Sequence, residues 1–116
     1  MHELSIAMAL VEAACEERER LGGVAVQTLH LRLGPLAGVV RESLSFSFDV
    51  AAAGTPIEGA RLEIEDMPIV VFCPACDAER GVASPQALAC PVCGSPTLDV
   101  RRGRELELRA LEVTGP

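Results

Sequence analysis

The sequence predicts an α+β fold in which a main domain is interrupted by a small cysteine-rich module. Three observations lead to this prediction. Apolar residues near the N-terminus recur at helical spacing, and in later segments apolar and polar residues alternate as they do in strands. Four cysteines form two C-x-x-C pairs between two of those strands. With 116 residues, the chain is long enough for one compact domain plus an appendage that needs its own cross-link.

The first expected element is a helix of about four turns that ends at Gly22-Gly23, a natural C-cap. Apolar side chains recur at helical spacing on one face: Leu4, Ala7, Met8, Val11, Ala14 and Cys15. Cys15 is the fifth, unpaired cysteine. We interpret it as a small buried apolar residue, with a reactive thiol as the alternative.

A strand is expected next, at residues 24–34, because β-branched and aliphatic residues prevail there and Gly34-Pro35 ends the run. Alternation places its side chains on an apolar face, with Ala25, Leu29, Leu31 and Leu33, and on a more polar face, with Val26, Thr28, His30 and Arg32. His30 is therefore interpreted as a solvated or packed strand histidine.

Residues 40–54 fit either a strand or a helix. Leu44, Phe46 and Phe48 alternate with polar residues as in a strand. Val40, Leu44 and Phe48 are also spaced as one stripe of a helix, and Gly54 follows as a cap. Periodicity alone does not decide between the two.

Two further strands are expected, at residues 60–66 and 104–113. The first alternates cleanly between apolar and charged side chains and is predicted to be half-buried. In the second, the apolar residues up to Leu108 and those from Leu111 onward fall in opposite phases. A bulge or burial on both faces explains that change.

The cysteine module contains the knuckles CPAC and CPVCGS, with the thiols of Cys73, Cys76, Cys90 and Cys93. Four thiolates at this spacing match a tetrahedral Zn²⁺ site, and the prolines and Gly94 favour the required turns. So short a segment cannot bury enough apolar surface to fold alone, so the metal serves as its core. Iron in a rubredoxin-like centre and a redox dithiol are the alternatives.

Charge and composition exclude several classes of function. The chain has ten arginines, no lysine and seventeen carboxylates, for a net charge of −7, and no Tyr or Trp. This argues against nucleic-acid binding, which relies on basic residues and aromatic stacking. No stretch resembles a membrane span or a signal peptide, so we expect a cytoplasmic protein without membrane contact. The one basic cluster, RRGR at 101–104, is either a solvated turn or a docking site for an acidic partner.

No arrangement of residues points to an enzyme. A nucleophile would need a base, and the only imidazoles are those of His2 and His30. No phosphate-cradling glycine loop is present. On the residues alone, two non-catalytic readings remain: a zinc-ribbon adaptor in transcription or translation, and an electron-transfer protein with iron in its four-cysteine site.

Several stretches together resemble the HypA/HybF family of hydrogenase nickel-incorporation proteins: MHELSIAMALVEAA, GPLAGV, ESLSFSFDVAAAGTPIEGARLEIE, CPAC and CPVCGS. The resemblance covers the chain from Met1 to about Val113. It implies that residues 42–53 are helical, which gives a main domain of two helices and three strands.

The resemblance further implies a nickel-binding α/β domain at residues 1–68 and 102–116 and a structural zinc ribbon at 69–101. Such proteins hand Ni²⁺ to the large subunit of [NiFe]-hydrogenase together with a GTPase accessory protein. In some organisms they also serve urease, which adds its maturation proteins as partners. The four cysteines match the zinc ligands, although Asp77 stands where a glycine often lies in such knuckles.

By the same resemblance, His2 matches the nickel-binding histidine and Glu3 its neighbour. Ni²⁺ accepts square-planar nitrogen ligands, which the His2 imidazole, the Met1 amine and the backbone nitrogens of His2 and Glu3 could supply. The start of a helix suits this role because its first N–H groups lack intrahelical partners. Binding that requires amide deprotonation is pH-sensitive and readily reversed, as a carrier needs.

Overall fold

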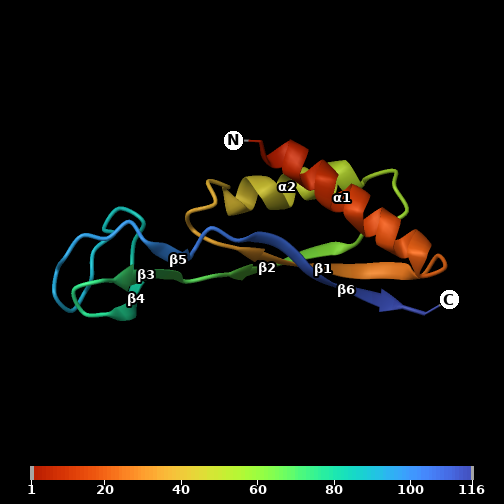
Figure 1. Cartoon of the computed structure of the whole chain (residues 1–116). Coiled ribbons are helices and arrows are strands. Elements are labelled where there is room, and N and C mark those ends of the chain that lie inside the picture. The colour runs from red at the N-terminus through yellow and green to blue at the C-terminus, as the bar shows by residue number, and fades with distance from the viewer. Residues whose placement is uncertain (1, 116) are drawn as a thin grey trace. The chain divides into compact units, whose positions relative to one another are not determined.

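The computed structural model describes residues 2–115, which form two helices and six strands (Figure 1). In chain order the elements are α1 (Glu3–Arg20), β1 (Ala25–Leu33), α2 (Arg41–Ala52), β2 (Arg61–Asp66), β3 (Ile69–Cys73), β4 (Ala78–Val82), β5 (Val100–Arg102) and β6 (Leu106–Thr114). They build two three-stranded sheets, with strand orders β2-β1-β6 and β4-β3-β5. The predicted α+β class is confirmed. Neither helix is long and apolar enough to cross a membrane.

The described chain divides into two compact units. The first comprises residues 2–31, 39–65 and 107–115, and holds both helices and most of the sheet β2-β1-β6. The second comprises residues 32–38 and 66–106, and holds the sheet β4-β3-β5 with the four paired cysteines. The second unit also takes in residues 32–38, 66–68 and 102–106, which the sequence analysis grouped with the main domain.

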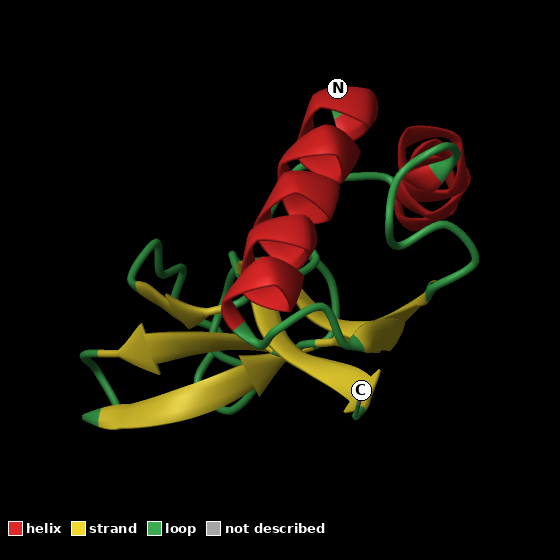
Figure 2. Ribbon diagram, turned by 90° about the vertical axis from the view of Figure 1, so that its right-hand side faces the viewer, coloured by secondary structure: helices red, strands yellow, loops and turns green. Residues whose placement is uncertain are grey.

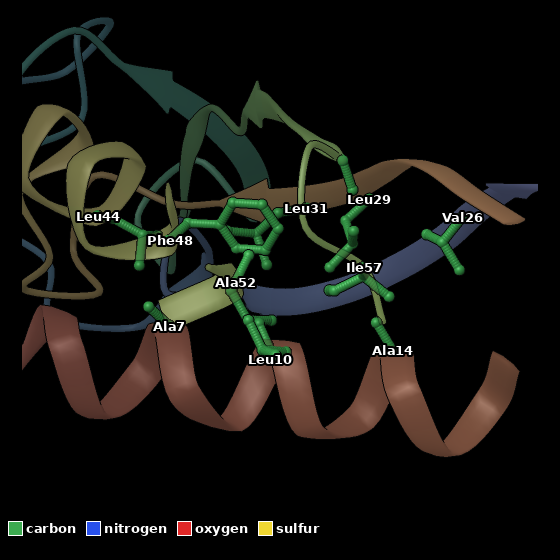
Figure 3. Packing of buried hydrophobic residues seen from close by; sticks show 12 residues of the cluster. Ala7, Leu10, Ala14, Val26, Leu29, Leu31, Leu44, Phe48, Ala52 and Ile57 are labelled. Carbon is green, nitrogen blue, oxygen red and sulfur yellow. The ribbon is translucent and has the colours of Figure 1, made fainter. Parts of the chain in front are cut away.

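One apolar core fills the first unit, between the two helices and the sheet. Figures 1 and 2 show α1 and α2 on the same side of the strands. Leu44 and Phe48 of α2 and Leu29 and Leu31 of β1 all belong to this core, and all four are fully buried (Figure 3). Ala7 and Ala14 of α1 are also fully buried, and their small side chains allow the helix backbone to approach closely.

Helix α2 resolves the ambiguity of residues 40–54 in favour of the helix that the family resemblance implies. Leu44, Phe48 and Ala52 lie four residues apart and are buried, as one helical face requires. Phe46, which the strand pattern groups with Phe48, is 71% exposed. The helical stripe therefore faces the core, and the alternation of serines with apolar residues has no structural counterpart.

Helix α1 ends before Gly22-Gly23, both with positive φ, as predicted, but it has 18 residues. Its buried face only partly matches the predicted one, because Ala7, Val11 and Ala14 are buried as expected. Leu4 and Met8, expected inside, are 49% and 58% exposed. The buried residues are Glu3, Ala7, Leu10, Val11 and Ala14. The structure thus buries Leu10, which the prediction did not include, and leaves Leu4 and Met8 largely exposed. Cys15 is half-buried at the edge of this core rather than fully buried.

Strand β1 departs from the simple alternation that the sequence predicts. Val26 and Thr28, assigned to the polar face, are buried, and Ala25, assigned to the apolar face, is exposed. From Leu29 to the end of the strand, the predicted apolar face is buried. The buried positions therefore change phase between Thr28 and Leu29, and Val26 and Leu29, an odd number of residues apart, both belong to the core.

Strand β6 shows the phase change predicted for residues 104–113. Leu108 and Leu111 are an odd number of residues apart, yet both pack against the core of the first unit. Leu106 and Val113 are 39% and 38% exposed. One apolar residue of each phase thus contributes to the core.

Candidate metal centres

Four cysteines from two separated knuckles come together in the second unit. Cys73 is the last residue of β3, and Cys76 lies in the tight turn that leads into β4. Cys90 and Cys93 lie in the loop between β4 and β5, where a bridge between Ala89 and Pro96 closes the second knuckle. The hairpin and the bridged loop thus bring thiols far apart in sequence to one place.

The spacing of the sulfur atoms fits a tetrahedral metal ion. The four Sγ atoms lie within 4.8 Å of one another. Cys73 Sγ is 3.5 Å from Cys93 Sγ, and Cys76 Sγ is 3.9 Å from Cys90 Sγ. A tetrahedral zinc with its usual sulfur bonds separates its ligand sulfurs by about 3.8 Å. Among residues 2–115, this is the one cluster of three or more side chains that could hold a metal.

Both knuckles contain the left-handed residue that tightens the turn. Gly94 has φ of 79°, and its N–H donates to the carbonyl of Cys90 at 2.8 Å. Asp77 takes the corresponding role after the first knuckle, with φ of 51°. Aspartate is among the few non-glycine residues that tolerate this conformation, so its presence leaves the first turn intact.

Backbone and side-chain donors around the sulfurs favour thiolates on the second knuckle. The N–H of Cys93, followed by that of Val92, lowers the pKa of Cys90 to about 6. The hydroxyl and N–H of Ser95 lower the pKa of Cys93. For Cys76, Arg80 lowers the pKa, but neighbouring thiols and burial outweigh it and raise the value to about 11. Four adjacent sulfurs cannot all ionise without a cation, and a divalent metal supplies one.

Arg80 belongs to this centre, although the sequence analysis did not name it. Its guanidinium interacts with the sulfurs of Cys76 and Cys90, and these contacts raise the pKa of the arginine. Its Nε is buried and has no hydrogen-bond partner among the described residues. A half-buried cation beside two of the sulfurs fits a metal centre with net negative charge, as four thiolates around one divalent ion produce.

The expected nickel ligands lie at the start of α1, in the first unit. His2 is the exposed N-cap residue, and its carbonyl accepts the N–H of Ile6 at 3.0 Å. Its imidazole makes no capping hydrogen bond to the helix. Met1, the third expected residue of this site, lies outside the described residues.

Glu3 is almost completely buried, which the sequence did not indicate. Its Oε2 accepts the N–H of Val40, the N-cap residue of α2, at 3.0 Å. This hydrogen bond lowers the pKa of the carboxyl, so the group is a carboxylate at neutral pH. The side chain of Glu3 therefore anchors the start of α1 to the start of α2.

The second histidine has a structural partner. His30 Nε2 lies 2.5 Å from Glu112 Oε1, and the pair links β1 to β6. The His30 side chain is 31% exposed. His30 is thus the packed strand histidine that the sequence suggested.

Comparison with known proteins places the chain in a family. The family model described as hydrogenase/urease nickel incorporation, metallochaperone, HypA, matches residues 1–113. The chain belongs to the HypA family. The hydrogenase maturation factor HypA of Roseiflexus sp. (strain RS-1) is 51% identical over 112 residues, covering 97% of this chain and 91% of that protein. The HypA protein of Chloroflexus aurantiacus is 50% identical over 113 residues, covering 97% and 99%.

Solved HypA structures share the fold. The solution structure of the Ni metallochaperone HypA from Helicobacter pylori aligns over the whole of both chains with a TM-score of 0.67 and 21% identity. A second HypA solution structure aligns over 100% of this chain and 98% of its own with a TM-score of 0.70. The resemblance that the sequence analysis drew to the HypA family is confirmed.

Proposed function

We propose that this protein carries Ni²⁺ at its N-terminus and delivers it for the maturation of [NiFe]-hydrogenase. Membership of a nickel-incorporation family supports the cargo and the process. The observation that carries the site is His2, an exposed histidine at the N-cap of α1 whose imidazole the helix does not use.

The proposed nickel ligands are nitrogen atoms from three consecutive residues. The His2 imidazole, the Met1 amine and the backbone nitrogens of His2 and Glu3 form fused chelate rings around a square-planar ion. The carboxylate of Glu3 is engaged with the N–H of Val40. We therefore assign the Glu3 side chain to holding the segment in place, and only its backbone nitrogen to nickel.

Cys73, Cys76, Cys90 and Cys93 are the proposed ligands of a structural Zn²⁺. The ion would cross-link the two cysteine knuckles within the second unit. Four sulfur ligands leave no open position for substrate or water, so no catalysis is assigned to the centre. We place the protein in the cytoplasm as a non-enzymatic carrier. Its partners are the GTPase accessory protein, the hydrogenase large subunit and, in organisms with urease, the urease maturation proteins.

The decisive experiment compares the two histidines. Untagged wild-type protein should bind about one Ni²⁺ besides one tightly held Zn²⁺. His2→Ala should lose the nickel and keep the zinc, whereas His30→Ala should keep both, because His30 pairs with Glu112. Metal content after equilibrium dialysis, measured by atomic emission, gives the stoichiometries.

The same variants test delivery in cells that lack the native protein. Hydrogenase activity at low external nickel should be restored by wild type and His30→Ala but not by His2→Ala. If His2→Ala binds nickel and restores activity as wild type does, the N-terminal site is wrong. A visibly coloured protein with iron in the cysteine site would instead favour electron transfer.

A further inference from the structure

The arginine cluster at the end of the cysteine module has a defined local structure. Strand β5 pairs with β3, with Val70 opposite Arg102 and Val71 opposite Val100. Arg101 is thus the extra residue of a β-bulge. Consecutive strand residues normally point to opposite faces, and a bulge re-aims them. Here Arg101 and Arg102 both line one pocket of about 310 Å³, together with Arg104 from the following turn.

The turn that carries these arginines is held rigidly. Gly103 has φ of 125° and is buried, and its carbonyl accepts the N–H of Leu36 at 2.7 Å. The N–H of Gly103 donates to the carboxylate of Glu105 at 2.9 Å. A Cβ at Gly34 would lie 2.2 Å from the Gly103 carbonyl oxygen, so the two glycine backbones pack directly on each other. The pocket wall is therefore preformed.

The three arginines are not equally engaged. Arg101 donates to both oxygens of Asp99, at 2.8 and 2.9 Å, and its guanidinium lies 4.6 Å from the centre of the Phe72 ring. The side chains of Arg102 and Arg104 are exposed and have no ion pair or hydrogen bond within residues 2–115. Two unpaired guanidinium groups thus flank a third that is held in place.

We propose that this arginine pocket, formed by Val100, Arg101, Arg102, Arg104 and Glu105, is a docking site for an acidic peptide segment of a partner protein. Guanidinium groups match carboxylates bidentately, and a preformed turn reduces the entropy lost on binding. The site stands out because the chain as a whole carries a charge of −7. It goes beyond the proposed nickel function and does not depend on it.

Peptide carboxylates suit this pocket better than a nucleic acid does. A nucleic acid requires a broad basic surface, and here the overall charge is strongly negative and lysine is absent. Its bases also need aromatic platforms, and the chain has only three Phe and no Tyr or Trp. A short acidic segment makes only local contacts, so it can reach two or three arginines without meeting the rest of the surface.

The test uses the zinc-loaded, untagged full-length protein and a hexaglutamate peptide with blocked ends and an uncharged fluorophore. Fluorescence anisotropy at about 150 mM salt limits long-range attraction. The double variant Arg102→Gln/Arg104→Gln removes both unpaired guanidinium groups. Arg61→Gln/Arg109→Gln removes the same charge from exposed positions on β2 and β6 and serves as the matched control. Zinc content and circular dichroism confirm that both variants fold.

The pocket variant should bind the peptide about tenfold more weakly than wild type, and the control should stay within about twofold. A hexaglutamine peptide should not bind measurably. If both double variants weaken peptide binding equally, the effect comes from net charge alone, and the proposal is overturned. A wild-type dissociation constant above about 1 mM, or tighter binding of a single-stranded RNA of equal charge, would also overturn it.

Discussion

Two side chains whose contacts the sequence analysis did not predict hold the candidate metal sites in place. Arg80 places a positive charge against the sulfurs of Cys76 and Cys90, with its Nε buried. Glu3 uses its carboxylate to tie the first turn of α1 to the N-cap of α2. Glu3 is almost completely buried and Arg80 is half-buried, and charged groups removed from solvent in this way need a partner.

Replacing Arg80 by Met keeps the length of the side chain but removes its charge and its donors. Zinc should then dissociate about tenfold faster, because second-shell partners of metal ligands typically contribute this much to metal affinity. The rate is measured by transfer of zinc to a chromophoric chelator. Glu79→Gln, which changes an adjacent exposed charge, is the control and should leave the rate unchanged. Equal rates for Arg80→Met and wild type would mean that the guanidinium does not stabilise the centre.

Among the elements, α2 shows how packing selects one of two local patterns. Its residues alternate as in a strand, but the helix places three apolar side chains on one face against α1 and β1. Phe48 fills the centre of this core, and Phe46, two residues earlier, points away from it. A strand would have placed both rings on the same face.

Phe48→Ala should lower the free energy of unfolding by about 3–5 kcal/mol, because the lost ring leaves a cavity in a closely packed core. Phe46→Ala, the same change on the same helix, should alter it by no more than about 0.5 kcal/mol. Urea denaturation followed by circular dichroism measures both values. If the two substitutions lower the free energy of unfolding equally, the face of α2 that packs on the core is assigned wrongly.

At the scale of the whole molecule, the two units are stabilised by different means. The first has a core of twelve buried residues drawn from both helices, β1 and the segment after α2. In the described part of the second, the buried apolar residues other than cysteine are Leu33, Ile69 and Val71. So small a core does not offset the entropy of ordering the chain, so the second unit needs a metal cross-link.

Removal of zinc by a strong chelator, with the thiols kept reduced, should therefore unfold the second unit and leave the first folded. Amide resonances of residues 69–102 should collapse to narrow dispersion, while those of α1 and α2 keep their positions. Added Zn²⁺ should restore the lost signals. If the whole chain unfolds together, or if neither unit responds, the cysteine centre does not have this structural role.

The sequence alone predicts the α+β class and the ends of most elements. It also predicts the two C-x-x-C knuckles and the family. Each rests on local spacing or a nearby motif: the glycines after α1, the alternation of β2, the two knuckles. The exposure of Leu4 and Met8, the burial of Val26 and the roles of Glu3 and Arg80 were not predictable. These depend on which surfaces meet across the fold, and on where a charged side chain finds its backbone or sulfur partner. The spacing of hydrophobic residues indicates a helix or a strand. Which side chains pack together, and which partners the buried charged groups find, is decided only when distant segments come together.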